Sequence, residues 1–203
     1  MNPSTEFIRP PAVAGAFYPA DSTILEQEVR QMLSQAQHVV SKRPQAMIAP
    51  HAGYIYSGQV AAQAYRQIQG ESYSRVVLLG PTHRVPFRGI AVSSATAFQT
   101  PLGFVKIDRA ARSRVLNYPC VVELEDAHRD EHSLETQLPF LQVVLSDEFQ
   151  ILPLLVSEPD PVTVADILEP FFVEPDTLLV VSSDLSHFHD YDTAMQIDRV
   201  TSQ

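Results

Sequence analysis

The sequence predicts an α/β fold, a three-layer sandwich with a mostly parallel central sheet and helices on both faces. Five apolar segments of strand length recur along the chain, at residues 46–49, 76–79, 90–92, 151–156 and 177–181. They are continuous rather than alternating, which is typical of strands buried on both faces. Segments with the period of an amphipathic helix separate several of these strands, so we expect βαβ units with parallel strands.

Two helices are predicted in the first third of the chain. One covers about residues 22–37, where Thr23 and Glu26 have the spacing of a capping box. The other follows Ser57. Their apolar stripes are Leu25, Val29, Met32, Leu33 and Ala36 in the first, and Val60, Ala61, Ala64, Tyr65 and Ile68 in the second.

Two further helices are predicted in the second half. One starts at Asp160-Pro161, which have the chemistry of an N-cap and a first helical position. It would bury Val164, Ile167, Leu168 and Phe171. The other covers residues 133–145, with Ser133 as its N-cap and Pro139 in its second turn.

Composition limits the functional classes. With 203 residues, 45% of them hydrophobic and 19% charged, we expect residues 1–203 to form a single domain. The net charge of −10 argues against nucleic-acid or membrane-surface partners, which need clustered basic residues. No apolar segment is long enough to span a bilayer. A single cysteine, Cys120, fits a reducing compartment, so we expect a cytoplasmic protein.

Histidines follow three of the predicted strands. His51 comes after the first, His83 after the second, and Asp184 and His187 after the last. The carboxyl ends of parallel strands open at one edge of a sheet, which is where ligands bind in such folds. Imidazole and carboxylate groups brought together there indicate a metal or acid–base site.

A further cluster surrounds His132. His128, Glu131 and His132 match the H-x-x-E-H pattern of inverted zinc peptidases, with Glu131 as general base. The context argues against that interpretation, because Ser133 resembles an N-cap and would place the motif before its helix. Glu135 follows three residues after His132, close enough for the two to support each other or a ligand, although a role at the helix start is an alternative.

Tyr54 stands in a segment between Gly53 and Gly58. Its hydroxyl could donate a hydrogen bond inside the pocket, and the alternative is that its ring packs under the loop. Arg84 and Arg88 lie beside His83 and could recognise a phosphate group.

Five blocks of the sequence together resemble the Memo family, also called protein B of the AmmeMemoRadiSam system, whose animal members are mediators of cell motility. The blocks are RPPAVAGAFYP at residues 9–19, APHAGYIYSG at 49–58, LGPTH at 79–83, EHSLETQLPF at 131–140 and SSDLSH at 182–187. The resemblance implies the architecture of class III extradiol (LigB-like) dioxygenases, whose relatives hold non-haem Fe(II). It also implies a functional link to a radical S-adenosylmethionine protein.

Carried over by position, the resemblance implies that His51 and His83 are metal ligands. Asp184, His187 and Tyr54 would be catalytic residues of the same pocket, with His132 and Glu135 in support. The expected cofactor is a divalent metal, Fe(II) first, with copper or zinc as alternatives. The family's metal site also contains a cysteine near the C-terminus, but no cysteine follows Cys120, so we expect a chain truncated at its C-terminus.

Three functions follow from these features. The first is a metal-dependent, dioxygenase-like oxidoreductase acting on an unidentified small molecule. The second is a non-catalytic module that binds a peptide or a phosphorylated ligand in the same pocket. The third is a metal-dependent hydrolase, which needs an open metal position, a water and a base.

Overall fold

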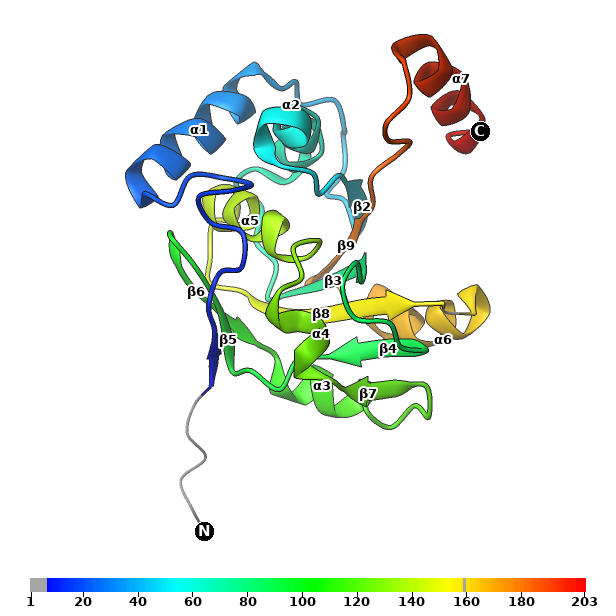
Figure 1. The fold of residues 1–203 in the computed structure, drawn as a ribbon. Helices are drawn as coiled ribbons and strands as arrows, with labels where there is room; N and C mark the ends of the chain where they lie inside the picture. The colour runs from blue at the N-terminus through cyan, green and yellow to red at the C-terminus, as the bar shows by residue number, and fades with distance from the viewer. Residues whose placement is uncertain (1–6, 159) are drawn as a thin grey trace.

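The computed structural model describes residues 7–158 and 160–203, which form one nine-stranded sheet flanked by helices (Figure 1). The strands are β1 (Ile8–Arg9), β2 (Ala46–Ala49), β3 (Arg75–Pro81), β4 (Gly89–Val92), β5 (Ala97–Thr100), β6 (Gly103–Ile107), β7 (Val121–Glu123), β8 (Gln150–Ser157) and β9 (Thr177–Ser182). The helices are α1 (Ser22–Gln35), α2 (Tyr54–Tyr65), α3 (Arg109–Val115), α4 (Glu125–Arg129), α5 (Leu138–Val144), α6 (Pro161–Phe172) and α7 (Tyr191–Thr201), with 3₁₀ turns η1 (Arg66–Ile68) and η2 (Glu135–Gln137).

The sheet has the order β1-β5-β6-β8-β3-β9-β2, and β4 pairs with both β7 and the second half of β8. Strands β8, β3, β9 and β2 are all parallel to their neighbours in that order, while the β5/β6 and β4/β8 pairs are antiparallel. All five predicted strands are present, and the prediction of a mostly parallel sheet is confirmed.

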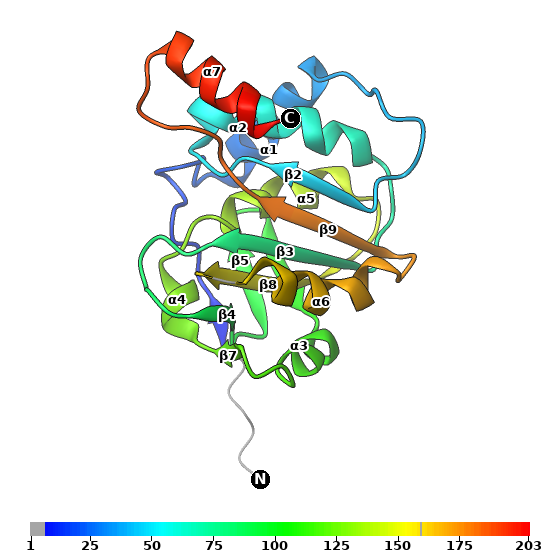
Figure 2. The same cartoon turned by 90° about the vertical axis from the view of Figure 1, so that its right-hand side faces the viewer.

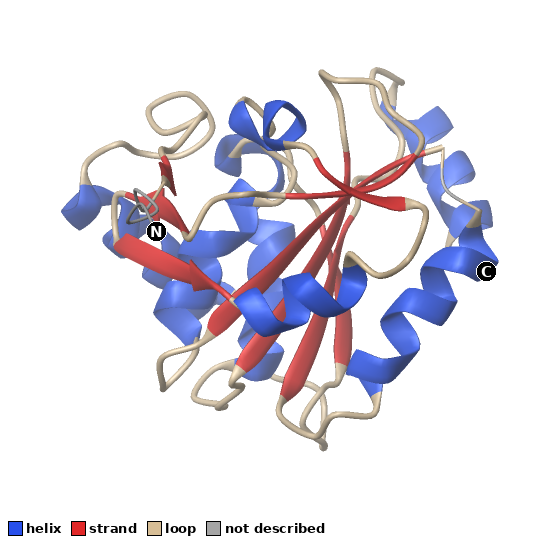
Figure 3. Ribbon diagram, turned by 90° about the horizontal axis from the view of Figure 1, so that it is seen from below, coloured by secondary structure: helices blue, strands red, loops and turns tan. Residues whose placement is uncertain are grey.

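Helices cover both faces of this sheet (Figures 2 and 3). Helices α1, α2 and α5 pack on one face, and α3 and α6 pack on the other. Strand β3 contributes to both cores, because Val76 and Leu78 join the first and Val77 joins the second. Continuous apolar strands therefore fill a core on each side, as the sequence predicted. The three-layer architecture is confirmed.

Strand β2 departs from that pattern. It lies at the end of the sheet, and Ile48 is 68% exposed. The expectation that both faces of this strand are buried is therefore wrong. Four short strands, β1, β5, β6 and β7, were not predicted, since each is only two to five residues long.

The first helix begins as predicted, but its cap differs. Asp21 is the N-cap, and its carboxylate accepts hydrogen bonds from the amides of Thr23 and Ile24. The predicted capping box is therefore wrong. Glu26 instead pairs with Arg30, one turn further along the helix.

Helix α2 begins at Tyr54, four residues before the predicted start after Ser57. Val60 is 61% exposed rather than buried, because the helix turns Ala61, Ala62 and Tyr65 toward the core. A Cβ added at Gly58 would lie 2.7 Å from a methionine sulfur of α1, so this glycine permits the close packing of α1 on α2.

The predicted helix at residues 133–145 is divided into the 3₁₀ turn η2 and helix α5. Pro139 has no amide to donate and stands in the first turn of α5, a position that proline tolerates. Ser133 is not an N-cap; its hydroxyl donates to the carbonyl of Pro81. Helix α6 agrees with the prediction, because Asp160 accepts from the Thr163 amide and Pro161 follows it.

Helix α7 runs from Tyr191 to Thr201, with Ser202 at its C-cap. Within the part of the chain that the structure describes, no helix is both long and apolar enough to cross a membrane.

Candidate metal centre

The loops after β2, β3 and β9 open at the same edge of the sheet, because β9 is parallel to both of its neighbours. His51, His83 and Asp184 each lie two residues beyond the end of one of these strands. The sequence predicted that these strand ends would converge, and the prediction is confirmed.

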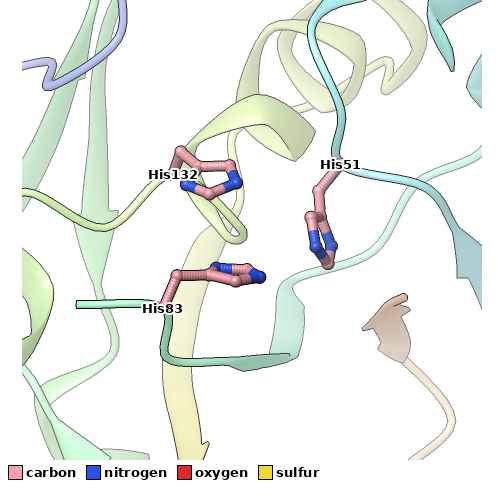
Figure 4. A group of neighbouring side chains, drawn as sticks. All are labelled: His51, His83 and His132. Atoms are coloured by element: carbon pink, nitrogen blue, oxygen red, sulfur yellow. The ribbon is translucent and has the colours of Figure 1, made fainter. Parts of the chain in front are cut away.

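His51, His83 and His132 form a cluster, which we call the histidine cluster (Figure 4). One ligand atom of each residue lies within 4.8 Å of the others, close enough for the three to hold a metal ion. The ring centroids are 5.2 Å apart for His51 and His83, 4.6 Å for His83 and His132, and 5.6 Å for His51 and His132. His132, predicted only as a supporting residue, thus occupies a position equivalent to the other two.

Hydrogen bonds determine which nitrogen of His51 is protonated. Its Nδ1 lies 2.8 Å from Ser182 Oγ. The Ser182 hydroxyl donates its one proton to the carbonyl of Ser133, at 2.6 Å, so it can only accept from the ring. Nδ1 of His51 therefore carries the proton, and Nε2 keeps its lone pair for a ligand.

The His51 ring is buried, and burial lowers its pKa to about 4, with repulsion from the other two imidazoles adding to the effect. The negative charge of Asp184 opposes this shift but does not overcome it. Burial also lowers the pKa of His132. Both rings are neutral at pH 7, the state that binds a metal.

Glu131 contacts the other two histidines. Its Oε1 lies 2.9 Å from Nδ1 of His83 and accepts from the amides of His132 and Ser133, at 2.8 and 2.9 Å. Its Oε2 accepts from the His83 amide at 2.6 Å. Burial alone would raise the pKa of Glu131, but these hydrogen bonds outweigh burial and lower it. The residue is therefore a carboxylate that accepts from the cluster.

Asp184 lies at the edge of the cluster. Its Oδ1 accepts from the His51 amide at 2.6 Å, and its Oδ2 is 3.7 Å from His51 Nε2. His187, which is half-exposed, reaches the same Oδ2 with Nε2 at 3.0 Å. Burial would raise the pKa of Asp184, but the His51 amide and the two imidazoles lower it. Two of the three predicted catalytic residues thus lie at the edge of the cluster, with Asp184 between His51 and His187.

Comparison with known proteins gives the family. A family model described as "Memo-like protein" matches residues 9–202. The chain belongs to the Memo family. It is 41% identical over 196 residues to a "MEMO1 family protein" of Aquifex aeolicus, covering 95% of this chain and 72% of the relative. A protein of the same description from Ignicoccus hospitalis is 38% identical over 208 residues, covering 94% of this chain and 73% of the relative. The human "Protein MEMO1" is 36% identical over 183 residues, covering 86% of this chain and 61% of the relative.

Three of the Memo-like blocks supply the cluster, while Tyr54 of the same blocks has a different position. Its hydroxyl donates to the carbonyl of Thr136 at 2.7 Å, and its ring packs against Tyr18 and Phe140. Burial raises its pKa well above the usual value. These contacts give Tyr54 the packing role that we had considered as the alternative, and they do not support a catalytic one.

Glu135 does not support His132. Its side chain is fully buried, and its two oxygens accept from Arg9 Nη1, the amides of Ala12 and Val13, and the Tyr18 hydroxyl, at 2.6 to 3.0 Å. Four donors occupy the carboxylate, and all four come from the first Memo-like block. Glu135 therefore anchors the N-terminal segment, and its predicted role beside a ligand is wrong.

The peptidase-like match is also explained. His128 lies in α4, is buried, and donates from Nε2 to the carbonyl of Ala91 at 3.1 Å. Burial lowers its pKa to about 3, so the ring is a neutral core residue. His132 follows the end of α4, and the two histidines share no helical face.

Arg88, predicted as a phosphate contact, is exposed and pairs with Glu158 at 3.6 Å.

Proposed function

We propose that this Memo-family chain binds one divalent metal ion through His51, His83 and His132, and that the favoured ion is Fe(II). The observation that carries the proposal is the convergence of three imidazoles from three separate loops. Burial lowers the pKa values of two of these histidines, His51 and His132, which keeps both rings neutral and able to bind a metal at pH 7.

The chemistry of the donors fits such an ion. Imidazole is a ligand for iron, copper, zinc and nickel, and two carboxylates, Glu131 and Asp184, lie against the rings and would balance a divalent charge. Two histidines and one carboxylate are the ligands of many non-haem Fe(II) sites, and Asp184 Oδ2, 3.7 Å from His51 Nε2, is the carboxylate oxygen that could join the imidazoles, which favours iron.

A bound iron would supply redox chemistry or polarise an oxygen of a substrate. The residues of the chain would do the rest. Asp184 lies between the cluster and the half-exposed His187, so this pair could hold or release a proton at the solvent side of the site. We therefore propose a redox, dioxygenase-like activity on a small molecule.

The test is anaerobic titration with Fe(II), with metal content measured by mass spectrometry on untagged protein. We expect wild type to bind one ion per chain and His51→Ala with His83→Ala to bind none. His189→Ala is the matched control, because this histidine lies in the loop after β9 but is exposed and outside the cluster. Equal binding by wild type and the double variant would overturn the proposal.

A second candidate is metal-dependent hydrolysis. It is favoured by the three-histidine set itself, which is the ligand set of some catalytic zinc sites that keep a fourth position for water. Hydrolysis of a model ester that is abolished by EDTA and restored by zinc, but not by Fe(II), would place this candidate first.

A further inference from the structure

We infer that Glu131 is the positioning residue of the histidine cluster. Its carboxylate holds His83 with Nδ1 protonated, so that this ring presents Nε2 as the ligand atom, and it holds the backbone of His132 beside it. The inference rests on the proposed function for its purpose, but the orientation itself is a property of the metal-free chain.

The contact with His83 is the stronger of the two. Glu131 accepts two hydrogen bonds from this residue, one from the backbone amide at 2.6 Å and one from Nδ1 at 2.9 Å. A carboxylate can only accept, so Nδ1 of His83 must carry the proton. The two residues are 48 positions apart in the sequence, so the contact fixes one loop of the site to another.

His132 is held by the same oxygen. Oε1 of Glu131 accepts from the His132 amide at 2.8 Å and lies 3.2 Å from Nδ1 of its ring. One carboxylate oxygen thus accepts from the His83 ring and from the His132 backbone. The two rings stack beside it, with centroids 4.6 Å apart and planes inclined by 23°.

The backbone around Glu131 is itself fixed by hydrogen bonds. The buried guanidinium of Arg9 donates from Nη2 to the Glu131 carbonyl and from Nε to the His128 carbonyl, both at 2.6 Å. The backbone of the loop is therefore held on its carbonyl side while the carboxylate holds the His83 imidazole. A side chain held in this way can impose a tautomer rather than adapt to one.

His51 provides an internal comparison. Its Nδ1 is held by the neutral hydroxyl of Ser182, at 2.8 Å, and not by Glu131. A change at Glu131 should therefore alter His83 and leave His51 as it was.

The experiment is long-range ¹H–¹⁵N NMR of the histidine rings in metal-free protein at pH 7, which reports the tautomer of each ring. Wild type should show the Nδ1–H form at His51 and His83. Glu131→Ala, which removes both acceptor oxygens, should shift His83 toward the Nε2–H form, with His51 unchanged. Metal affinity, measured with Zn(II) alone, should fall about 10- to 100-fold.

Glu125→Ala is the matched control, because Glu125 is a partly buried carboxylate of the same region whose partners are Ser93 and Ser94. It should leave all three tautomers unchanged. Glu131→Asp, which keeps the charge, should recover part of the wild-type tautomer signal.

An unchanged His83 tautomer in Glu131→Ala would overturn the inference, even if affinity fell. If that variant does not fold, the wild-type spectrum decides, since Nε2–H at His83 contradicts the inference. Should the tautomers agree while wild type binds no metal, the proposed function fails and the positioning role stands.

Discussion

Glu131 and Glu135 are two buried carboxylates four residues apart, yet they serve different parts of the molecule. Their exposed fractions are 3% and 0%, and each accepts four hydrogen bonds. The donors to Glu135 are a guanidinium, two amides and a phenol of the N-terminal segment. The donors to Glu131 include an imidazole of the histidine cluster.

The comparison shows that burial and hydrogen-bond count do not distinguish a structural carboxylate from a functional one. The donors do. A guanidinium or a phenol hydroxyl offers no lone pair to a metal ion, whereas an imidazole that gives its Nδ1 proton retains a free Nε2. Glu135 therefore contributes to stability, and Glu131 additionally determines what the cluster can bind.

The largest expected effect concerns Glu135. Replacing it by alanine leaves the Arg9 guanidinium buried without its partner, which should cost about 3–5 kcal/mol of unfolding free energy. Urea denaturation of the purified variant measures this. A loss below about 1 kcal/mol would remove the distinction between the two carboxylates.

Acid should destabilise the protein through its buried histidines. The pKa values of His51 and His128 are lowered to about 4 and about 3, from 6.5. Below pH 6.5 these two histidines are protonated in the unfolded chain but remain neutral in the folded chain. The free energy of unfolding therefore falls as the pH falls toward 4.

For His51 alone, that loss is about 3 kcal/mol between pH 6.5 and 4. Urea midpoints of metal-free protein at pH 7, 5.5 and 4.5 measure it, and His51→Asn should show a shallower decline. A wild-type midpoint that does not change over this range would contradict the assigned neutral rings.

Removing the His132 ring tests whether this neighbour of Glu131 is a metal ligand. Removing its ring by His132→Ala deletes a ligand and leaves the loop backbone intact, so metal affinity should fall by more than about 100-fold, beyond the loss typical of an orienting residue. Competition with a chromophoric chelator measures this fall. His128→Asn, which removes a buried histidine of the same region, should change affinity far less.

The smallest effect is expected at Ser182. Ser182→Ala removes the acceptor for His51 Nδ1, and metal affinity should fall about 10-fold. Thermal unfolding should also show a modest loss of stability, because Gln137 Nε2, which donates to this hydroxyl at 2.9 Å, loses a partner. An affinity equal to that of wild type would show that this hydrogen bond does not orient the ring.

The sequence predicted the sheet and its strand ends, and with them the convergence of His51, His83 and Asp184, because strand direction determines where the loops open. It did not predict the equivalence of His132, which lies in an irregular loop between α4 and η2 with no periodicity to place it. Glu131 entered only as a peptidase base, and Glu135 was misassigned by its distance from His132. Their true partners come from segments up to 126 residues away, which spacing cannot reveal.

The most direct test of the metal centre is anomalous diffraction from crystals of the chain grown with one equivalent of Zn(II), recorded at the zinc absorption edge. The account predicts one peak per chain, in contact with Nε2 of His51, Nε2 of His83 and the His132 ring. A peak bound to Nδ1 of His51 or His83, or a main peak away from these three rings, would contradict it.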